Sequence, residues 1–334
     1  MKALSRGSRS LCALAALAFA IQTSQSGAFQ ANAAPMSAWT TQRFSKSDLP
    51  CLPLSKEKVF RIGQHSSPDN AYMMMAASYL AYSFWPGKRM RILSSWGFSN
   101  IQLFDDSASS TNGYWAEHTD FILIAFRGTQ EPTDLLIDIA VKLERLEEGR
   151  ENILVHSGFK RGAESVWKHV EGAARYAQER KKPLFVTGHS LGGAVALLNA
   201  LRLEKSNFPV QALWTFGAPK VGNNLFFQSA RALFEAKWHR INQETDPIPA
   251  LPFTFEDENR LRHWSNRWGQ FIPVLERFAE NSQYDTAPLV YRETTSELTQ
   301  RPITRRRFSE IGLGFLKHLP RSYVCDLAQE KLKL

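Results

Sequence analysis

One serine of the chain stands in the pentapeptide GHSLG at residues 188–192, which has the pattern G-x-S-x-G. An apolar run at 183–187 precedes it, and a helix-forming segment at 194–203 follows it. Between a strand and a helix, this pattern is typical of a nucleophilic serine on a sharp turn; the alternative is a purely structural turn. We therefore expect Ser190 to attack acyl carbonyl groups. The backbone N–H of Leu191, at the start of the helix, would bind the negative charge that develops on the substrate oxygen.

A serine hydroxyl becomes a good nucleophile only when a base takes its proton and a carboxylate orients that base. Where G-x-S-x-G supplies the nucleophile, the chain order is serine, acid, histidine. Asp246 follows a predicted strand at 238–243, and the carboxyl ends of strands carry the chemistry of such sheets. The other acids considered are Asp257, Asp285, Asp326 and several glutamates. Of the later histidines, His239 lies inside that strand and is expected to pack, whereas the residues alone do not decide between His263 and His318.

The elements that would position these residues alternate along the chain. We expect strands at 121–126, 183–187, 210–216 and 238–243, and helices at 69–85, 162–180 and 194–203. Strands that alternate with helices predict an α/β protein with a mostly parallel sheet. The run FILIAF at 121–126 is apolar throughout, which is typical of a strand buried on both faces.

Four segments, in the same order along the chain, resemble motifs of the class 3 lipases, the family of the filamentous-fungal triacylglycerol lipases. They are FRGT at 126–129, VHSGF at 155–159, VTGHSLGGA at 186–194 and TFGAPKVG at 215–222. The resemblance runs from about residue 69 to 252 and resumes near 318. It implies an α/β-hydrolase fold, with a mostly parallel central sheet flanked by helices and a lid helix. We expect residues 34–334 to form one such domain, with an unrecognised insertion at about 257–313.

The resemblance also implies roles for site residues. Asp246 stands in the family's D-x-x-P pattern, and His318, followed five residues later by a tyrosine, matches its catalytic histidine. Thr129 would give the oxyanion hole a backbone N–H and a hydroxyl beside the N–H of Leu191. No group of residues has metal-ligand spacing, and we expect no metal and no cofactor.

In this family the segment after the oxyanion loop is a mobile lid. Here that segment is PTDLLIDIAVKLER at 132–145, which has the pattern of a helix with a wide apolar face. The apolar residues assigned to the lid are Leu135, Leu136, Ile139 and Leu143. Such a face would bind a lipid–water interface when the lid opens, and the alternative is a helix packed permanently on the sheet.

The first residues predict export. Lys2, Arg6 and Arg9 precede an apolar run at 11–21, and the tripeptide Ala-Asn-Ala at 31–33 is a cleavage motif. We expect residues 1–33 to be a signal peptide of a secreted or periplasmic protein. Its apolar run is shorter than the roughly 20 residues that cross a bilayer, so no transmembrane segment is expected.

The cysteines bear on the same point. Cys12 lies within the predicted signal peptide, which leaves Cys51 and Cys325 in the exported chain. In an oxidising compartment such a pair indicates a disulfide, with two free buried thiols as the alternative.

The charge of the chain is compatible with a lipid or ester as its partner. The 334 residues carry a formal charge of +9, which favours anionic surfaces only modestly, and no motif points to nucleic acid. The leading hypothesis is a secreted lipase that cleaves acylglycerol esters through an acyl-serine. The alternatives are a phospholipase A1, an esterase of soluble esters, and a catalytically silent lipid-binding relative.

Overall fold

The computed structural model describes residues 51–52, 67–82, 86–129, 143–147, 152–234, 236–243, 246, 248–251, 290–292, 298–300 and 318–331. All of them lie in the compact unit Ser45–Leu334. The predicted signal peptide, the candidates His263, Asp257 and Asp285, and the predicted lid residues Leu135, Leu136 and Ile139 lie outside the described residues.

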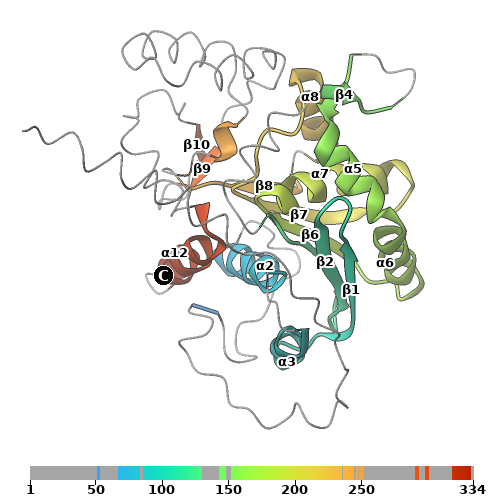
Figure 1. Cartoon of the computed structure of the whole chain (residues 1–334). Helices are drawn as coiled ribbons and strands as arrows, with labels where there is room; N and C mark the ends of the chain where they lie inside the picture. The colour runs from blue at the N-terminus through green and yellow to red at the C-terminus, as the bar shows by residue number, and fades with distance from the viewer. Residues whose placement is uncertain are drawn as a thin grey trace, which may run out of the picture. The chain divides into compact units, whose positions relative to one another are not determined.

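A six-stranded sheet forms the centre of the described structure, in the order β1-β2-β3-β6-β7-β8 (Figure 1). The strands are β1 (Ser99–Asp106), β2 (Thr111–Glu117), β3 (Ile122–Phe126), β6 (Leu184–His189), β7 (Val210–Phe216) and β8 (Trp238–Ile241). Strands β3, β6, β7 and β8 are parallel neighbours. Strands β1 and β2 extend the sheet antiparallel at one edge. The mostly parallel sheet of the α/β-hydrolase fold is thus confirmed, and β1 and β2 are the strands that the sequence did not indicate.

Helices cover both faces of this sheet. Those described are α2 (Pro68–Leu80), α3 (Pro86–Ser95), α5 (Ser157–Ser165), α6 (Trp167–Glu179), α7 (Leu191–Lys205), α8 (Asn224–Phe234) and α12 (Pro320–Lys331). Outside the main sheet the structure describes four short strands and a 3-10 helix: β4 (Leu143–Arg145), β5 (Leu154–His156), β9 (Val290–Arg292), β10 (Leu298–Gln300) and η3 (Ile248–Ala250). In the described part of the chain, no helix is both long and apolar enough to cross a membrane.

Two apolar cores lie on opposite faces of the sheet, as side chains alternate along a strand. Ile122, Ile124 and Phe126 of β3 pack in one core with α5, α6, α7 and α8. Leu123 and Ala125 pack in the other with α2 and α12. Helices α2 and α12 lie next to each other, although they come from opposite ends of the described chain (Figure 1). The α2–α12 layer therefore brings the C-terminal segment against the sheet.

Helix α2 shows why its sequence folds as it does. The Ser67 side chain caps the helix by accepting the N–H of Asn70, and Pro68 occupies the first turn, where its missing N–H has no partner to lose. Ten of its 13 residues are buried, so the helix is a core element and not a surface helix with one apolar stripe. It ends at Leu80, earlier than the predicted residue 85.

The prediction of one helix at 162–180 was wrong in two respects. The single helix expected at 162–180 is two helices, α5 and α6, separated at Val166, whose ψ of 2° leaves the helical region. Helix α5 also begins earlier, at Ser157, because the His156 ring nitrogen Nδ1 accepts the backbone N–H groups of Gly158 and Phe159. Histidine is not among the residues that usually signal a helix start.

The last residues of the helix predicted over 132–145 are not helical. Residues Leu143–Arg145 form a short strand, β4, which pairs antiparallel with β5. The main-chain groups of Leu143 are therefore placed for pairing with His156 across the two strands and not for a helix. The rest of that segment, 130–142, lies outside the described residues.

Candidate active site

Ser190 occupies a sharp turn between β6 and α7. Its backbone has φ 59° and ψ −132°, a conformation rarely adopted by residues other than glycine and costing roughly 1–3 kcal/mol. Its N–H donates to the carbonyl of Phe216 on the neighbouring strand β7. A Cβ on Gly188 would lie 2.1 Å from the carbonyl oxygen of Gly192, so only glycine fits there. The turn is the strand–turn–helix geometry that G-x-S-x-G requires.

The structure brings Ser190, His318 and Asp246 together. Nε2 of His318 lies 2.8 Å from Oγ of Ser190, and Nδ1 of His318 lies 2.7 Å from Oδ2 of Asp246. These residues are separated by 128 and 72 positions in sequence, and each is at most 3% exposed. The three side chains therefore form a buried hydrogen-bonded chain from hydroxyl to imidazole to carboxylate.

Asp246 is held in place by two further donors. The Tyr323 hydroxyl donates to Oδ2 at 2.6 Å, and the backbone N–H of Ile248 donates to Oδ1 at 2.9 Å. Burial, and then the negative charge of Asp246, raise the pKa of Tyr323 well above its usual value, so the hydroxyl keeps its proton and remains a donor. Gly217, with φ +56°, passes so close that a Cβ there would lie 2.8 Å from Oδ2 of Asp246.

The two residues predicted for the oxyanion hole lie in the segments next to Ser190. Leu191 is the first residue of α7, where a backbone N–H has no partner within the helix. Thr129 follows β3, and its buried Oγ1 has no hydrogen-bond partner among the described residues. The backbone of Gly128 packs closely against Ser190, because a Cβ on residue 128 would lie 2.7 Å from Cβ of Ser190. Gly128, the residue before Thr129, therefore lies against Ser190, and Leu191 follows Ser190 in sequence.

A tyrosine that the sequence did not single out touches both loops beside Ser190. Tyr82, two residues after α2, accepts the N–H of Gly128 with its hydroxyl at 3.0 Å, and the same hydroxyl lies 2.8 Å from Nδ1 of His189. The His189 ring in turn packs against the rings of His318 and Tyr323, with centroid distances of 4.9 and 5.3 Å. No spacing in the sequence links Tyr82 to GHSLG, so only the fold reveals this contact.

Other candidates are placed away from this cluster. His239 lies in β8, as expected, and stacks on Trp214 with a centroid distance of 5.0 Å. Asp326 lies on α12 and is half-buried. Among the residues that the structure describes, no three His, Cys, Asp or Glu side chains are grouped so as to hold a metal ion.

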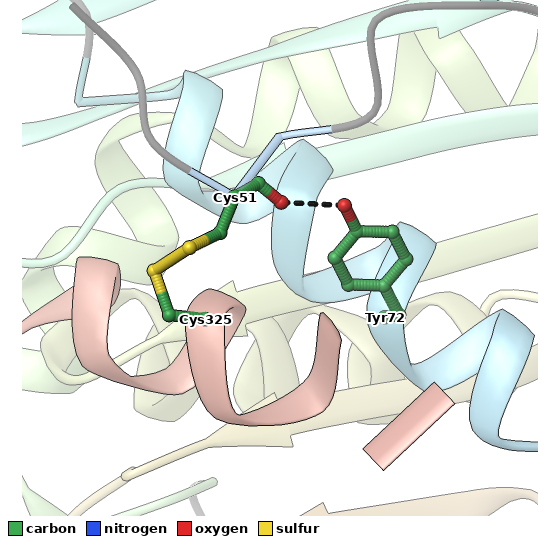
Figure 2. Close-up of a disulfide and its surroundings, with 3 residues drawn as sticks. All are labelled: Cys51, Tyr72 and Cys325. Atoms are coloured by element: carbon green, nitrogen blue, oxygen red, sulfur yellow. Dashed lines mark hydrogen bonds between the residues drawn. A yellow bond between two sulfur atoms is a disulfide. The ribbon is translucent and has the colours of Figure 1, made fainter. Parts of the chain in front are cut away.

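A disulfide joins Cys51 to Cys325 on α12, close to the site (Figure 2). The Tyr72 hydroxyl, on α2, donates to the carbonyl oxygen of Cys51 at 2.5 Å. Tyr323 lies two residues before Cys325 on the same helix, and His318 lies just before that helix begins. The covalent bond therefore fixes the helix that supplies the Asp246 contact to a segment at the other end of the described chain.

Part of the chain is similar to known lipases. The family model Lipase (class 3) matches residues 123–256. A lipase from Caenorhabditis elegans is 33% identical over 139 residues, which are 41% of this chain and 39% of that protein. A secreted mono- and diacylglycerol lipase from Fusarium solani is 41% identical over 101 residues, 29% of each protein. The chain thus spans well under half the length of these curated relatives.

A solved structure shows the same fold over a longer stretch. The crystal structure of a mutant form of MDLA from Penicillium cyclopium is 20% identical, covers 72% of this chain and 85% of its own, and aligns with a TM-score of 0.50. Residues 123–256 are thus similar to the class 3 lipase family, and the likeness to the solved structure extends the shared fold beyond them.

Proposed function

We propose that this protein is a secreted serine carboxylic-ester hydrolase, a lipase that cleaves acylglycerol esters through an acyl-serine intermediate. The observation that carries the proposal is the hydrogen-bonded chain from Ser190 through His318 to Asp246, with distances of 2.8 and 2.7 Å. This is the arrangement that activates a serine hydroxyl, with Ser190 as nucleophile, His318 as base and Asp246 as the group that orients the histidine.

In the first half-reaction, Nε2 of His318 takes the Ser190 hydroxyl proton as Oγ attacks the ester carbonyl carbon. The carbonyl oxygen gains the negative charge and accepts N–H groups from Leu191 and Thr129, with the Thr129 hydroxyl as a third donor. One such donor contributes about 3 kcal/mol to lowering the barrier. When the tetrahedral intermediate collapses, the alcohol leaves with the proton from His318, and the acyl group stays on Ser190.

In the second half-reaction, a water molecule replaces the alcohol. His318 takes a proton from the water, whose oxygen attacks the acyl carbonyl carbon, and the same donors bind the second oxyanion. Collapse breaks the bond to Oγ of Ser190, returns the proton to that oxygen and releases the carboxylic acid. Asp246 keeps Nδ1 of His318 in the donor state throughout, because the carboxylate accepts that N–H.

Acylglycerols are the substrate class that the available observations favour. The relative from Fusarium solani is named as a mono- and diacylglycerol lipase. Leu319, directly after His318, is 38% exposed, so an apolar side chain stands beside the proposed base. Leu135, Leu136 and Ile139 would add a lid that binds the lipid–water interface when it opens.

Export completes the proposal. Residues 1–33 would be removed as a signal peptide, and the protein would be secreted or periplasmic. The Cys51–Cys325 disulfide supports this, because structural disulfides persist mainly in oxidising compartments. N-terminal sequencing of the exported protein tests it, and mature protein that still begins at Met1 would contradict it.

A substrate panel with one control variant tests the activity. The protein and Ser190→Ala should be assayed on mono-, di- and triacylglycerol emulsions, on phosphatidylcholine, and on p-nitrophenyl esters of graded chain length. We expect hydrolysis of acylglycerols by the unaltered protein only, and labelling of Ser190 by a serine-directed phosphonate.

Other outcomes point to other functions. Preference for phosphatidylcholine would indicate a phospholipase A1, and preference for soluble short esters would indicate an esterase. Neither labelling nor hydrolysis would indicate a silent lipid-binding relative and would refute the proposal.

A further inference from the structure

We propose that Tyr82 is a positioning residue whose hydroxyl sets the separation between the two halves of the oxyanion hole. The inference rests on the proposed function and adds to it a residue outside the catalytic motifs. It follows from a contact that two loops share. One loop carries Gly128 and Thr129, and the other carries His189, Ser190 and Leu191.

The Tyr82 hydroxyl is hydrogen-bonded to both loops. It lies 3.0 Å from the backbone nitrogen of Gly128 and 2.8 Å from Nδ1 of His189. A Cβ on Gly128 would lie 2.3 Å from the hydroxyl oxygen, so the loop can approach Tyr82 only because residue 128 is glycine. Thr129 is the next residue after Gly128, and Leu191 is two residues after His189. Fixing Gly128 and His189 therefore fixes the backbone that presents both proposed oxyanion donors.

The protons of this contact can be assigned from the groups present. Burial lowers the pKa of His189 well below its usual value; the charge of His318 lowers it further, and a hydrogen bond to the His318 backbone opposes this. The ring is therefore neutral, and one of its nitrogens accepts. The Gly128 N–H can only donate, so the tyrosine oxygen accepts there, and we assign the hydrogen of the hydroxyl to Nδ1 of His189. Burial also raises the pKa of Tyr82 above its usual range, which keeps that hydrogen in place. The proton of neutral His189 is then on Nε2.

The separation of the two loops matters because an oxyanion donor acts only over a narrow distance. Donors contribute when they lie 2.7–3.1 Å from the oxyanion, and removal of one lowers kcat by about 10²–10³. Without the Tyr82 hydroxyl, the N–H of Gly128 and Nδ1 of His189 both lose the partner that holds them together. The two donors then move relative to each other, which weakens binding of the transition state more than binding of the substrate.

If Tyr82 had a purely structural role, its loss would lower stability without lowering kcat. Tyr114 offers a matched control for this comparison. Tyr114 is fully buried, and its hydroxyl also makes a hydrogen bond to α2, to the carbonyl of Ala77 at 2.8 Å. Tyr114→Phe therefore removes a buried tyrosine hydroxyl without touching either loop. If Tyr82 served stability alone, Tyr82→Phe and Tyr114→Phe would lower the midpoint of urea unfolding and leave kcat of the folded protein unchanged.

The experiment compares both variants with the unaltered full chain on a soluble short-chain p-nitrophenyl ester. A trifluoromethyl ketone, whose adduct with a serine carries a tetrahedral oxyanion, is used as a reversible inhibitor. We expect Tyr82→Phe to lower kcat by about 10- to 100-fold, as for misplacement of one donor, with KM changed less than about threefold. Its inhibition constant for the ketone should rise by a similar factor, and Tyr114→Phe should change neither value.

A second pair of variants keeps the test independent of how Tyr82→Phe folds. In His189→Asn the amide oxygen replaces Nδ1 as an acceptor for the Tyr82 hydroxyl, whereas His189→Leu offers none. We expect at least tenfold higher kcat in the asparagine variant. Equal kcat in this pair, or a kcat for Tyr82→Phe within twofold of that for Tyr114→Phe, would overturn the assignment while leaving the proposed function intact. If the unaltered protein neither hydrolyses the ester nor binds the ketone, the proposed function fails and the role of Tyr82 fails with it.

Discussion

Tyr323 shows how one hydroxyl can support an acid from outside the catalytic set. Its hydroxyl donates a hydrogen bond to Oδ2 of Asp246, the same oxygen that is hydrogen-bonded to Nδ1 of His318. A hydrogen bond to a charged group contributes about 1.5–3 kcal/mol. We expect Tyr323→Phe to lower kcat by about tenfold or more with little change in KM, because the carboxylate then orients His318 less well.

Tyr176→Phe is the control for that measurement. The Tyr176 hydroxyl also donates to a carboxylate, that of Glu117 at 2.7 Å, but this pair lies outside the site. Both variants should lose some stability in urea unfolding, and only Tyr323→Phe should lose turnover. A similar kcat in the two variants would show that Tyr323 acts on stability alone.

The three proposed catalytic residues give the most severe predictions. Ser190→Ala should lower kcat by about a millionfold and leave the fold intact, since a serine and its base act as one unit. His318→Ala should be nearly as severe, and His263→Ala much milder. The measurement is the rate of ester hydrolysis by each purified variant. Circular dichroism checks that each variant is folded. A folded His263→Ala protein without activity, beside an active His318→Ala protein, would reverse the assignment of the base.

His189 makes the stability of the protein depend on pH. Its pKa in the folded protein is lowered by burial, whereas an unfolded histidine has a pKa near about 6.5. Below about pH 6.5 the unfolded chain therefore binds a proton that the folded protein does not. The free energy of unfolding should fall as pH drops, by up to about 1.4 kcal/mol per pH unit from this residue, until pH reaches the folded pKa.

Urea unfolding of the unaltered protein and His189→Asn between about pH 7.5 and 5 measures this contribution. The pKa of His118 is also lowered by burial, but His118 is present in both proteins, so the difference between the two slopes isolates His189. Parallel curves would contradict the prediction.

At the scale of elements, the sequence predicted best those that lie at the centre of the sheet. Strand β3 is apolar along its whole length, and every residue of β6 and β7 except Gln211 is buried, because helices cover both faces. The helix after Ser190 begins with Leu191 and Gly192, the last two residues of its motif. Strand β1 was not indicated, because it is the exposed edge strand and only Phe104 of its eight residues is buried. Strand β1 is formed by its pairing with β2, and its own sequence has no apolar pattern typical of a strand.

Short elements depended on contacts that the sequence does not display. Strand β4 forms by pairing with β5, and α5 begins at a histidine cap. The site shows the same division. GHSLG and Asp246 were predicted from local pattern and His318 from family resemblance, whereas Tyr82 contacts residues that lie 46 and 107 positions away from it in the sequence. Such contacts follow from the packing of α2 on the sheet, which no local spacing records.

The disulfide joins two elements, and its removal should affect both stability and turnover. Closing a loop of 274 positions restricts the unfolded chain, an effect of about 3–5 kcal/mol. We expect Cys51→Ser with Cys325→Ser to lower the free energy of unfolding by about that amount. Activity should also fall, because α12 carries Tyr323. Urea unfolding and ester hydrolysis with and without reductant measure both effects.

The double serine variant, which has no Cys51–Cys325 bond to reduce, is the control for other effects of the reductant. Dithiothreitol should destabilise the unaltered protein and leave the variant unchanged. If the unaltered protein keeps the same unfolding midpoint and kcat after complete reduction, the bond has no part in holding α12.

For the molecule as a whole, the remaining prediction concerns activation at a lipid surface. If Leu135, Leu136 and Ile139 form the interface-binding face of a lid, activity should rise sharply once an ester exceeds its solubility. Burial of each leucine or isoleucine in lipid contributes roughly 1.5–3 kcal/mol, which would favour the open state at the interface.

Leu135→Ser with Leu136→Ser should therefore reduce hydrolysis of emulsified triacylglycerol more than that of a soluble short-chain ester. Initial rates on the two substrates are the measurement. Equal losses on both would mean that the segment is structural and that the protein acts as an esterase.

The bond between Cys51 and Cys325 also makes most of the chain a closed covalent ring. Any single cut of the main chain between these two residues opens the ring but leaves one molecule, with the fragment bearing His318 still attached to the fragment bearing Cys51. A proteolytic nick in the long stretch between η3 and His318 thus does not release the proposed catalytic base. A nicked protein of this kind migrates as two pieces on a gel only after reduction, and in an extracellular setting rich in proteases it keeps all of its residues together.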